Sequence, residues 1–182
     1  MTADLIPVKN DDLKKKGTNE KKLPTNETII IAPHPDDELI GCWEVFESGV
    51  KPIVIYTSQM SAERQQDALQ LKKHVDVKAQ LFLRSIPGNL QDPSNTFYFP
   101  HPIYETHPEH RIQGITGEQL ARTGRNVIFY ITEMNAPFKY ECKNPKKKKL
   151  LLDSVYFGES PLWTWDHKYF LFSGYDKWVY NV

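Results

Sequence analysis

The sequence predicts an α/β fold, built on a mostly parallel sheet with helices on both faces. Residues 28–32 (TIIIA) form a short apolar run rich in β-branched residues, which is typical of a strand buried on both faces. A segment with helical periodicity follows, and the same alternation of strand and helix patterns recurs further along the chain. With 182 residues the chain is long enough for one domain of ordinary size, which we place at residues 27–182.

The predicted elements follow one another from this first strand. Apolar residues recur at helical spacing from Leu39 to Phe46, and Gly49 ends this helix. The remaining patterns predict strands at 52–57, 80–83 and 126–132, and helices at 61–75 and from 107 to about 122. Such an alternation is typical of a Rossmann-like sheet, whose ligand sites lie outside the carboxyl ends of the strands.

Three segments depart from this alternation. Residues 86–106 contain four prolines, so we expect a long loop with a functional role and no regular element. Residues 1–26 carry ten charges and no aromatic residue, which predicts a flexible extension before the domain. Residues 150–182 contain ten of the 22 aromatic residues and follow a lysine run at 146–149. There we expect an amphipathic helix over 148–156, and then a segment whose rings cover the sheet.

Composition and charge narrow the classes of partner. Lys plus Arg equal Asp plus Glu at 23 each, so no net charge attracts a polyanion or an anionic membrane. Lysines beside aromatic residues can hold single-stranded nucleic acid, but Leu150, Leu151 and Leu152 beside the run have the character of core residues, so we do not favour this partner. No apolar run approaches the ~20 residues of a membrane helix, and the amino terminus lacks the apolar core of a secretion signal. We therefore expect a cytoplasmic protein and leave its oligomeric state open.

A group of potential metal ligands follows the first strand directly: His34, Asp36, Asp37 and Glu38. A histidine three residues before an aspartate can reach the same cation from a turn, and imidazole with carboxylate suits zinc, and also iron, manganese or nickel. Two adjacent carboxylates repel each other unless a cation or hydrogen-bond donors compensate them. The alternative is an acidic helix start, in which Asp36 or Asp37 caps the amides and Glu38 complements the helix dipole. Capping alone does not explain a histidine between two prolines.

A second group of this kind, HPEH at residues 107–110, follows the proline-rich loop and opens a predicted helix. Its two histidines, three residues apart in a first turn, can face one cavity. Because the carboxyl ends of parallel strands share one edge of the sheet, we expect the two groups to meet. In that case His34, Asp37 and one of the later histidines supply the three protein ligands of a catalytic zinc, and Asp36 is left as a base.

These two groups also resemble a known family. The segment IIIAPHPDDE at residues 29–38 resembles the signature of the zinc-dependent de-N-acetylases of the LmbE and PIG-L superfamily, in which an apolar strand runs into AHPDDE; Pro33 is a departure. HPEH at 107–110 is similar to the second signature of that family, HPDH, with Glu109 in place of Asp. The resemblance covers residues 28–132, in the order found in the family.

By position, the resemblance implies that His34, Asp37 and His110 hold one zinc ion per chain, with other divalent metals as alternatives. It also implies that Asp36 is the general base and His107 the acid. Zinc lowers the pKa of its bound water and polarises the acetamide oxygen while Asp36 takes the proton. Protonated His107 stabilises the oxyanion and then donates to the departing amine. We expect a nearby carboxylate to raise the pKa of His107 for this role.

The resemblance extends to the substrate, with departures. Arg64 and Asp67 are similar to an arginine and an acidic residue, usually Glu, on a helix of the family. Arg64 is a candidate to hold a hydroxyl, phosphate or carboxylate of the substrate, and a surface salt bridge to Asp67 is an equal alternative. Where the family often has a tyrosine that polarises the carbonyl, this chain has Glu105, and Tyr104 is the candidate to substitute. Two more histidines are expected to be structural or solvated: His74 and His101.

The predicted function is that of a metal-dependent amidohydrolase, which removes an acetyl group from a small N-acetylated amino sugar or glycoconjugate by attack of zinc-bound water. One alternative is a metal-dependent hydrolase of another bond, such as a phosphoester, because activated water does not itself choose its electrophile. Another is a carbohydrate- or nucleic-acid-binding module that retains the site without turnover. Asp36 argues against this last alternative, since a binding module needs the ligands but not the base.

Overall fold

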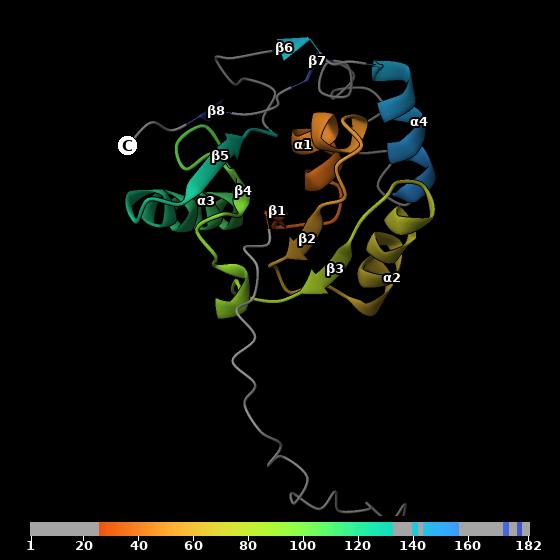
Figure 1. Cartoon of the computed structure of the whole chain (residues 1–182). Coiled ribbons are helices and arrows are strands. Elements are labelled where there is room, and N and C mark those ends of the chain that lie inside the picture. Colours follow the sequence, from red (N-terminus) through yellow and green to blue (C-terminus); the bar gives the residue numbers. More distant parts are fainter. Residues whose placement is uncertain (1–25, 133–139, 142–143, 157–172, 175–177, 180–182) are drawn as a thin grey trace, which may run out of the picture.

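The computed structural model describes residues 26–132, 140–141, 144–156, 173–174 and 178–179 (Figure 1). A six-stranded sheet has the order β3-β2-β1-β4-β5-β8, in which β1 to β5 are parallel and β8 pairs antiparallel with β5. Its strands are β1 (Thr28–Ala32), β2 (Ile53–Tyr56), β3 (Ala79–Phe82), β4 (Thr96–Pro100), β5 (Asn126–Tyr130) and β8 (Trp178–Val179). A separate short pair is formed by β6 (Tyr140–Glu141) and β7 (Ser173–Gly174). The prediction of a mostly parallel α/β sheet is confirmed.

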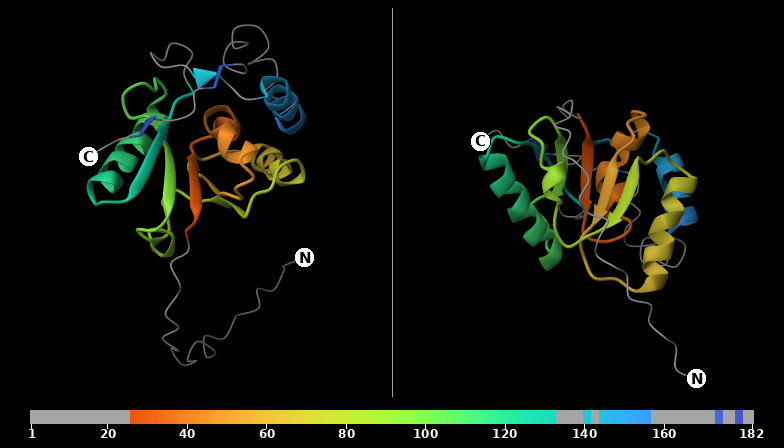
Figure 2. Two further views of the ribbon diagram at one scale, coloured as in Figure 1. Left: turned by 45° about the horizontal axis from the view of Figure 1, so that its top comes forward. Right: turned by 60° about the horizontal axis from the view of Figure 1, so that its bottom comes forward.

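Helices cover both faces of the sheet, as predicted (Figure 2). Helices α1 (Asp37–Glu47), α2 (Ala62–Gln70) and α4 (Pro145–Val155) share one face, and α3 (Pro108–Arg122) lies on the other. Two short 3-10 turns are η1 (Leu71–Lys73), which continues α2, and η2 (Gly88–Leu90). Helix α4 occupies the predicted amphipathic segment. The expected amino-terminal extension and most of the aromatic tail lie outside the described residues.

The prediction that residues 86–106 contain no regular element is wrong. Strand β4 lies within this segment and pairs with β1 on one side and β5 on the other, so it is central to the sheet. The prolines do not interrupt it, because Pro93 precedes the strand and Pro100 is its last residue. A proline at the end of a strand removes a single ladder hydrogen bond, which a sheet tolerates. The apolar residues Phe97 and Phe99 are completely buried.

Helix α3 packs unusually close to the carboxyl end of β4, because glycines face it. A Cβ atom on Gly114 would lie 2.6 Å from the backbone of Pro102, and one on Gly117 would lie 2.6 Å from the ring of Phe99. Contacts this short do not occur in folded proteins, so the backbone beside Gly114 leaves no room for a Cβ, and a Cβ at Gly117 would displace the side chain of Phe99. The close packing fixes the first turn of α3 beside the end of β4.

The lysine run does not form a basic surface. Lys148 is completely buried, and its Nζ donates to the carbonyl of Ile40 at 2.6 Å. Lys147 pairs with Glu47 at 2.7 Å, and Lys149 pairs with Asp153 on the next turn of α4. Two of the four lysines are thus paired with carboxylates, and a third is buried. No helix in the described part of the chain combines the length and the apolar character needed to cross a membrane.

Candidate metal centre

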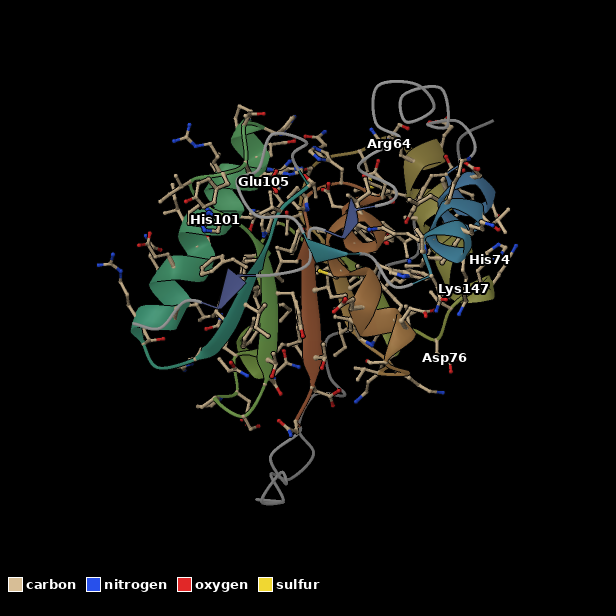
Figure 3. All side chains as sticks on the ribbon, turned by 90° about the horizontal axis from the view of Figure 1, so that it is seen from above. Arg64, His74, Asp76, His101, Glu105 and Lys147 are labelled. Atoms are coloured by element: carbon tan, nitrogen blue, oxygen red, sulfur yellow. The ribbon has the colours of Figure 1, made fainter. Side chains whose placement is uncertain are left out.

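The two predicted ligand groups meet at the carboxyl edge of the sheet, between β1 and β4. The chain leaves β1 toward α1 on one face, and leaves β4 toward α3 on the other face. The crevice between such strands is the usual ligand site of an open α/β sheet. Figure 3 looks onto the molecule from above and shows Glu105 and Arg64 at this edge, on opposite sides of the strand ends.

Three of the predicted ligands bring one atom each to a common point. Nδ1 of His34 lies 3.1 Å from Nε2 of His110, and Oδ2 of Asp37 lies 3.5 Å and 3.1 Å from these two nitrogens. Ligand atoms arranged around a tetrahedral zinc at ~2.1 Å lie about 3.4 Å apart. The triangle therefore has the size that one such cation requires. His107 widens the set, because nitrogens of His34, His107 and His110 lie within 4.8 Å of one another.

Each imidazole of the triangle contacts a carboxylate through its other nitrogen. Nδ1 of His110 lies 2.9 Å from Oε2 of Glu105, and Nε2 of His34 lies 2.6 Å from Oε2 of Glu109. Glu105 is itself held by Thr132, whose backbone N–H donates at 2.6 Å and whose hydroxyl donates at 2.9 Å. Carboxylates behind histidines in this way orient metal-binding imidazoles and increase their basicity.

The charges of these carboxylates determine the protonation of the cluster. Burial opposes protonation of His110, but Asp37 and Glu105 outweigh it and raise the pKa of His110 to about 11. Burial likewise opposes the charge on Asp37, yet His110 and His34 hold its pKa below the usual value. The pKa of His34 is raised, because its contacts with Asp37 and Glu109 outweigh burial. His110 is therefore protonated at neutral pH, and a bound cation would replace its proton.

Asp36 precedes α1 in a strained backbone conformation, with φ of 105°, and its side chain makes no capping hydrogen bond with the helix. A positive φ in a residue other than glycine costs on the order of 1–3 kcal/mol. Its backbone N–H donates to Oε2 of Glu38 at 3.1 Å. The alternative in which Asp36 caps the helix is therefore wrong, and Asp37 is engaged with His34 and His110 instead.

Glu38 is completely buried below Asp36 and accepts a hydrogen bond from the hydroxyl of Tyr156, next to the end of α4. Burial raises the pKa of Glu38 to about 8. Glu38 thus links the loop that carries Asp36 to α4 and does not act as an exposed dipole-complementing residue.

His107 lies at the exposed rim of the cluster. It is the N-cap of α3, and its Nδ1 accepts a hydrogen bond from the N–H of Glu109 at 3.3 Å. Its ring centroid lies 4.7 Å from that of His34 and 5.2 Å from that of His110. Burial and these two neighbouring imidazoles lower the pKa of His107. The expectation that a carboxylate raises this pKa is wrong, because burial and the two neighbouring imidazoles outweigh Glu109 and Asp37.

The remaining predicted residues have different positions. Arg64 lies in the first turn of α2, and no salt bridge within the described part of the chain joins it to Asp67.

Tyr104 packs its ring against His101 at 4.5 Å. His101 is buried, and its Nδ1 accepts the N–H groups of Ile103 and Tyr104, so its role is structural. Burial lowers the pKa of His101 to about 4. Exposed His74 lies away from the cluster (Figure 3).

Two contributors to the site do not follow from the sequence patterns, Glu105 and Thr132. In the sequence, Glu105 is notable because it occupies a position where the similar family often has tyrosine. A carboxylate five residues before His110 also indicates a group that could orient the His110 ring. Thr132 lies just beyond β5, and only the order of the strands places it beside β4.

Comparison with known protein families, with curated proteins and with solved structures finds no match for this chain. The class that the fold and the site define is therefore an α/β protein of Rossmann-like topology, with a histidine cluster that could hold a metal ion at the carboxyl edge of its sheet.

Proposed function

We propose that the protein is a metal-dependent hydrolase that removes an acetyl group from an N-acetylated amino sugar or glycoconjugate. The observation that carries this proposal is the triangle of His34 Nδ1, Asp37 Oδ2 and His110 Nε2, with every edge between 3.1 and 3.5 Å. A set of two imidazoles and one carboxylate is a known ligand set of catalytic zinc, which leaves a further position for water or substrate.

In this proposal His34, Asp37 and His110 hold the metal, for which zinc fits the donor set best. When bound, the metal would lower the pKa of water and polarise the amide carbonyl. Glu105 and Glu109 keep the outer nitrogens of His110 and His34 engaged, so the inner nitrogens remain directed at the shared point. His107 is an alternative ligand, because its ring lies within the same cluster.

Asp36 has the role of general base in this proposal. Its strained backbone and the absence of a capping bond support a role other than starting the helix, since strain at a residue next to ligands is often functional. Asp36 takes the proton of the attacking water, and His107 at the rim is placed to give a proton to the departing amine. The pKa of His107 is lowered, which favours transfer of its proton to the departing amine once His107 is protonated.

The acetyl-sugar substrate rests on the resemblance of residues 29–38 and 107–110 to the de-N-acetylase signatures. The test is to measure amine release from a panel of N-acetyl sugars, with zinc and with a chelator. Asp36→Asn should retain zinc but lose turnover, while His74→Ala, far from the cluster, should retain both.

Amine release that requires metal and Asp36 would support the proposal. Zinc-dependent release of phosphate from phosphoesters, with no amine release from any sugar in the panel, would replace it with phosphoester hydrolysis. Binding of zinc without any turnover of either substrate class would indicate a binding module.

A further inference from the structure

A second feature at the carboxyl edge is a pocket of about 160 Å³ at the ends of β2 and β3. Its walls include Thr57, Ser58, Gln59, Gln65, Phe82 and Arg84. These residues lie after β2, in α2 and around the end of β3, so they belong to different elements from the histidines.

Backbone hydrogen bonds join the pocket to the segment that precedes His34. The N–H groups of Thr57 and Ser58 donate to the carbonyls of Ala32 and Pro33, each at 3.1 Å, and His34 is the next residue. The pocket wall is therefore bonded to the segment that carries His34.

The pocket carries a positive charge. Among the described lining residues Arg84 is the one charged side chain, and none is acidic. Nη2 of Arg84 donates to Oε1 of Gln59 at 3.2 Å, which holds the guanidinium at the wall. A guanidinium has five N–H donors in a planar fork that matches a carboxylate or phosphate. The amides of Gln59 and Gln65 add further polar groups.

Thr57 supplies an independent indication of a ligand. Thr57 is 8% exposed, and within the described residues its Oγ1 has no hydrogen-bond partner. A buried hydroxyl without a partner destabilises a folded chain, so such groups are rare unless a ligand or water satisfies them.

We propose that this pocket is a subsite for an anionic substituent, a phosphate or a carboxylate, on the substrate whose amide is cleaved at the histidine cluster. Arg84 binds the anion and Thr57 donates to it. This inference rests on the proposed function for the identity of the substrate, but the preference for an anion can be measured as binding alone.

The experiment uses the full chain with Asp36→Asn, loaded with zinc, so that ligands bind without turnover. Calorimetry measures the affinity for N-acetylglucosamine, its 1-phosphate, its 6-phosphate and N-acetylmuramic acid. We expect at least one anionic sugar to bind about 10-fold tighter than the neutral one, which is the contribution of one charged hydrogen bond. Comparison of the phosphates with the carboxylate identifies which anion the pocket takes.

Variants of Arg84 and Thr57 test whether these two side chains bind the anion. Arg84→Gln should abolish the preference, whereas Arg122→Gln, which removes an arginine paired with Glu118 at the far end of α3, should retain it. Thr57→Val should weaken anion binding while leaving the melting temperature unchanged or higher, because valine removes the unpartnered hydroxyl.

Equal affinity for neutral and anionic sugars would overturn the subsite, even if the protein hydrolyses them. A preference that survives Arg84→Gln would also overturn it, because the anion would then bind the metal itself. A preference that requires Arg84, in a protein whose wild type releases amine from none of these sugars, would support the subsite and overturn the proposed reaction.

Discussion

Glu105 and Asp37 contact opposite nitrogens of His110: Oε2 of Glu105 lies 2.9 Å from Nδ1, and Oδ2 of Asp37 lies 3.1 Å from Nε2. This arrangement assigns different tasks to the two nitrogens. Glu105 accepts from Nδ1–H, which leaves Nε2 as the nitrogen able to bind a metal beside Asp37. Because Glu105 is anchored by Thr132, the orientation of His110 depends on β5 as well as on α3.

Glu105→Gln should weaken zinc binding by about 10- to 100-fold. The glutamine amide can donate to Nδ1 of His110 and thereby move the proton to Nε2, the nitrogen that faces Asp37. A zinc titration against a competing chelator measures the loss. Glu118→Gln, which changes a carboxylate elsewhere on α3, is the matched control and should retain full affinity. Unchanged zinc affinity in Glu105→Gln would show that Glu105 does not orient the ligand.

Asp36→Gly should separate stability from turnover. Glycine adopts φ of 105° without strain, so we expect the free energy of unfolding to rise by about 1 kcal/mol. Loss of the base should lower turnover on the order of 100-fold. Denaturant unfolding and amine release measure the two effects, and Asp36→Asn should reproduce only the second. Full activity in both variants would remove Asp36 from the mechanism.

His107 and His110 should respond differently to substitution. His110 is buried within the triangle, whereas His107 is exposed at its rim. We therefore expect His110→Ala to lose zinc, and His107→Ala to retain zinc with a lower maximal rate. Metal analysis of the two purified variants decides between the ligand sets. Loss of zinc from both, or from His107→Ala alone, would assign His107 as a ligand.

The fold and the meeting of the two ligand groups can be predicted from the sequence because both depend on local patterns. A buried strand, a turn and a helix are each visible in neighbouring residues, and parallel topology then brings the strand ends together. Strand β4 is not predicted in this way, because Pro93 and Pro100 suggest an irregular loop. In the structure these prolines lie before the strand and at its last residue. The segment TFYFP contains aromatic residues of high strand propensity that outweigh its terminal proline.

The electrostatics of the site cannot be predicted in the same way. Whether His107 is protonated depends on its distance from two other imidazoles, which come from the end of β1 and from the next turn of α3. The pairing of Glu109 with His34 joins residues 75 positions apart. The sequence shows which residue types are present. The distances between their side chains depend on how α1 and α3 pack on the two faces of the sheet.

Zinc binding should release protons. The pKa of His110, at about 11, keeps this imidazole protonated at neutral pH, and the pKa of His34 is raised as well. Only neutral imidazoles bind metal. The apparent affinity should therefore rise with pH, by up to about 10-fold per pH unit for each proton displaced. Calorimetry at pH 7 in buffers of different ionisation enthalpy counts the released protons. Zinc uptake with no proton release would mean that the imidazoles are neutral before the metal binds.

Gly114→Ala should weaken both the fold and the metal site. The new Cβ would lie 2.6 Å from the backbone of Pro102 and 2.7 Å from the carbonyl oxygen of Pro100, and backbone atoms cannot rotate away. We expect a net loss of about 1–3 kcal/mol in the free energy of unfolding, although alanine favours a helix over glycine by about 1 kcal/mol. Helix α3 carries His110, so a shift of α3 should also lower zinc affinity.

Gly88→Ala is the matched control, because a Cβ at Gly88 meets no atom within 4 Å. Denaturant unfolding and zinc titration of the two variants measure both effects. A stability loss with unchanged zinc affinity would show that the cluster adjusts independently of the packing of α3 on β4.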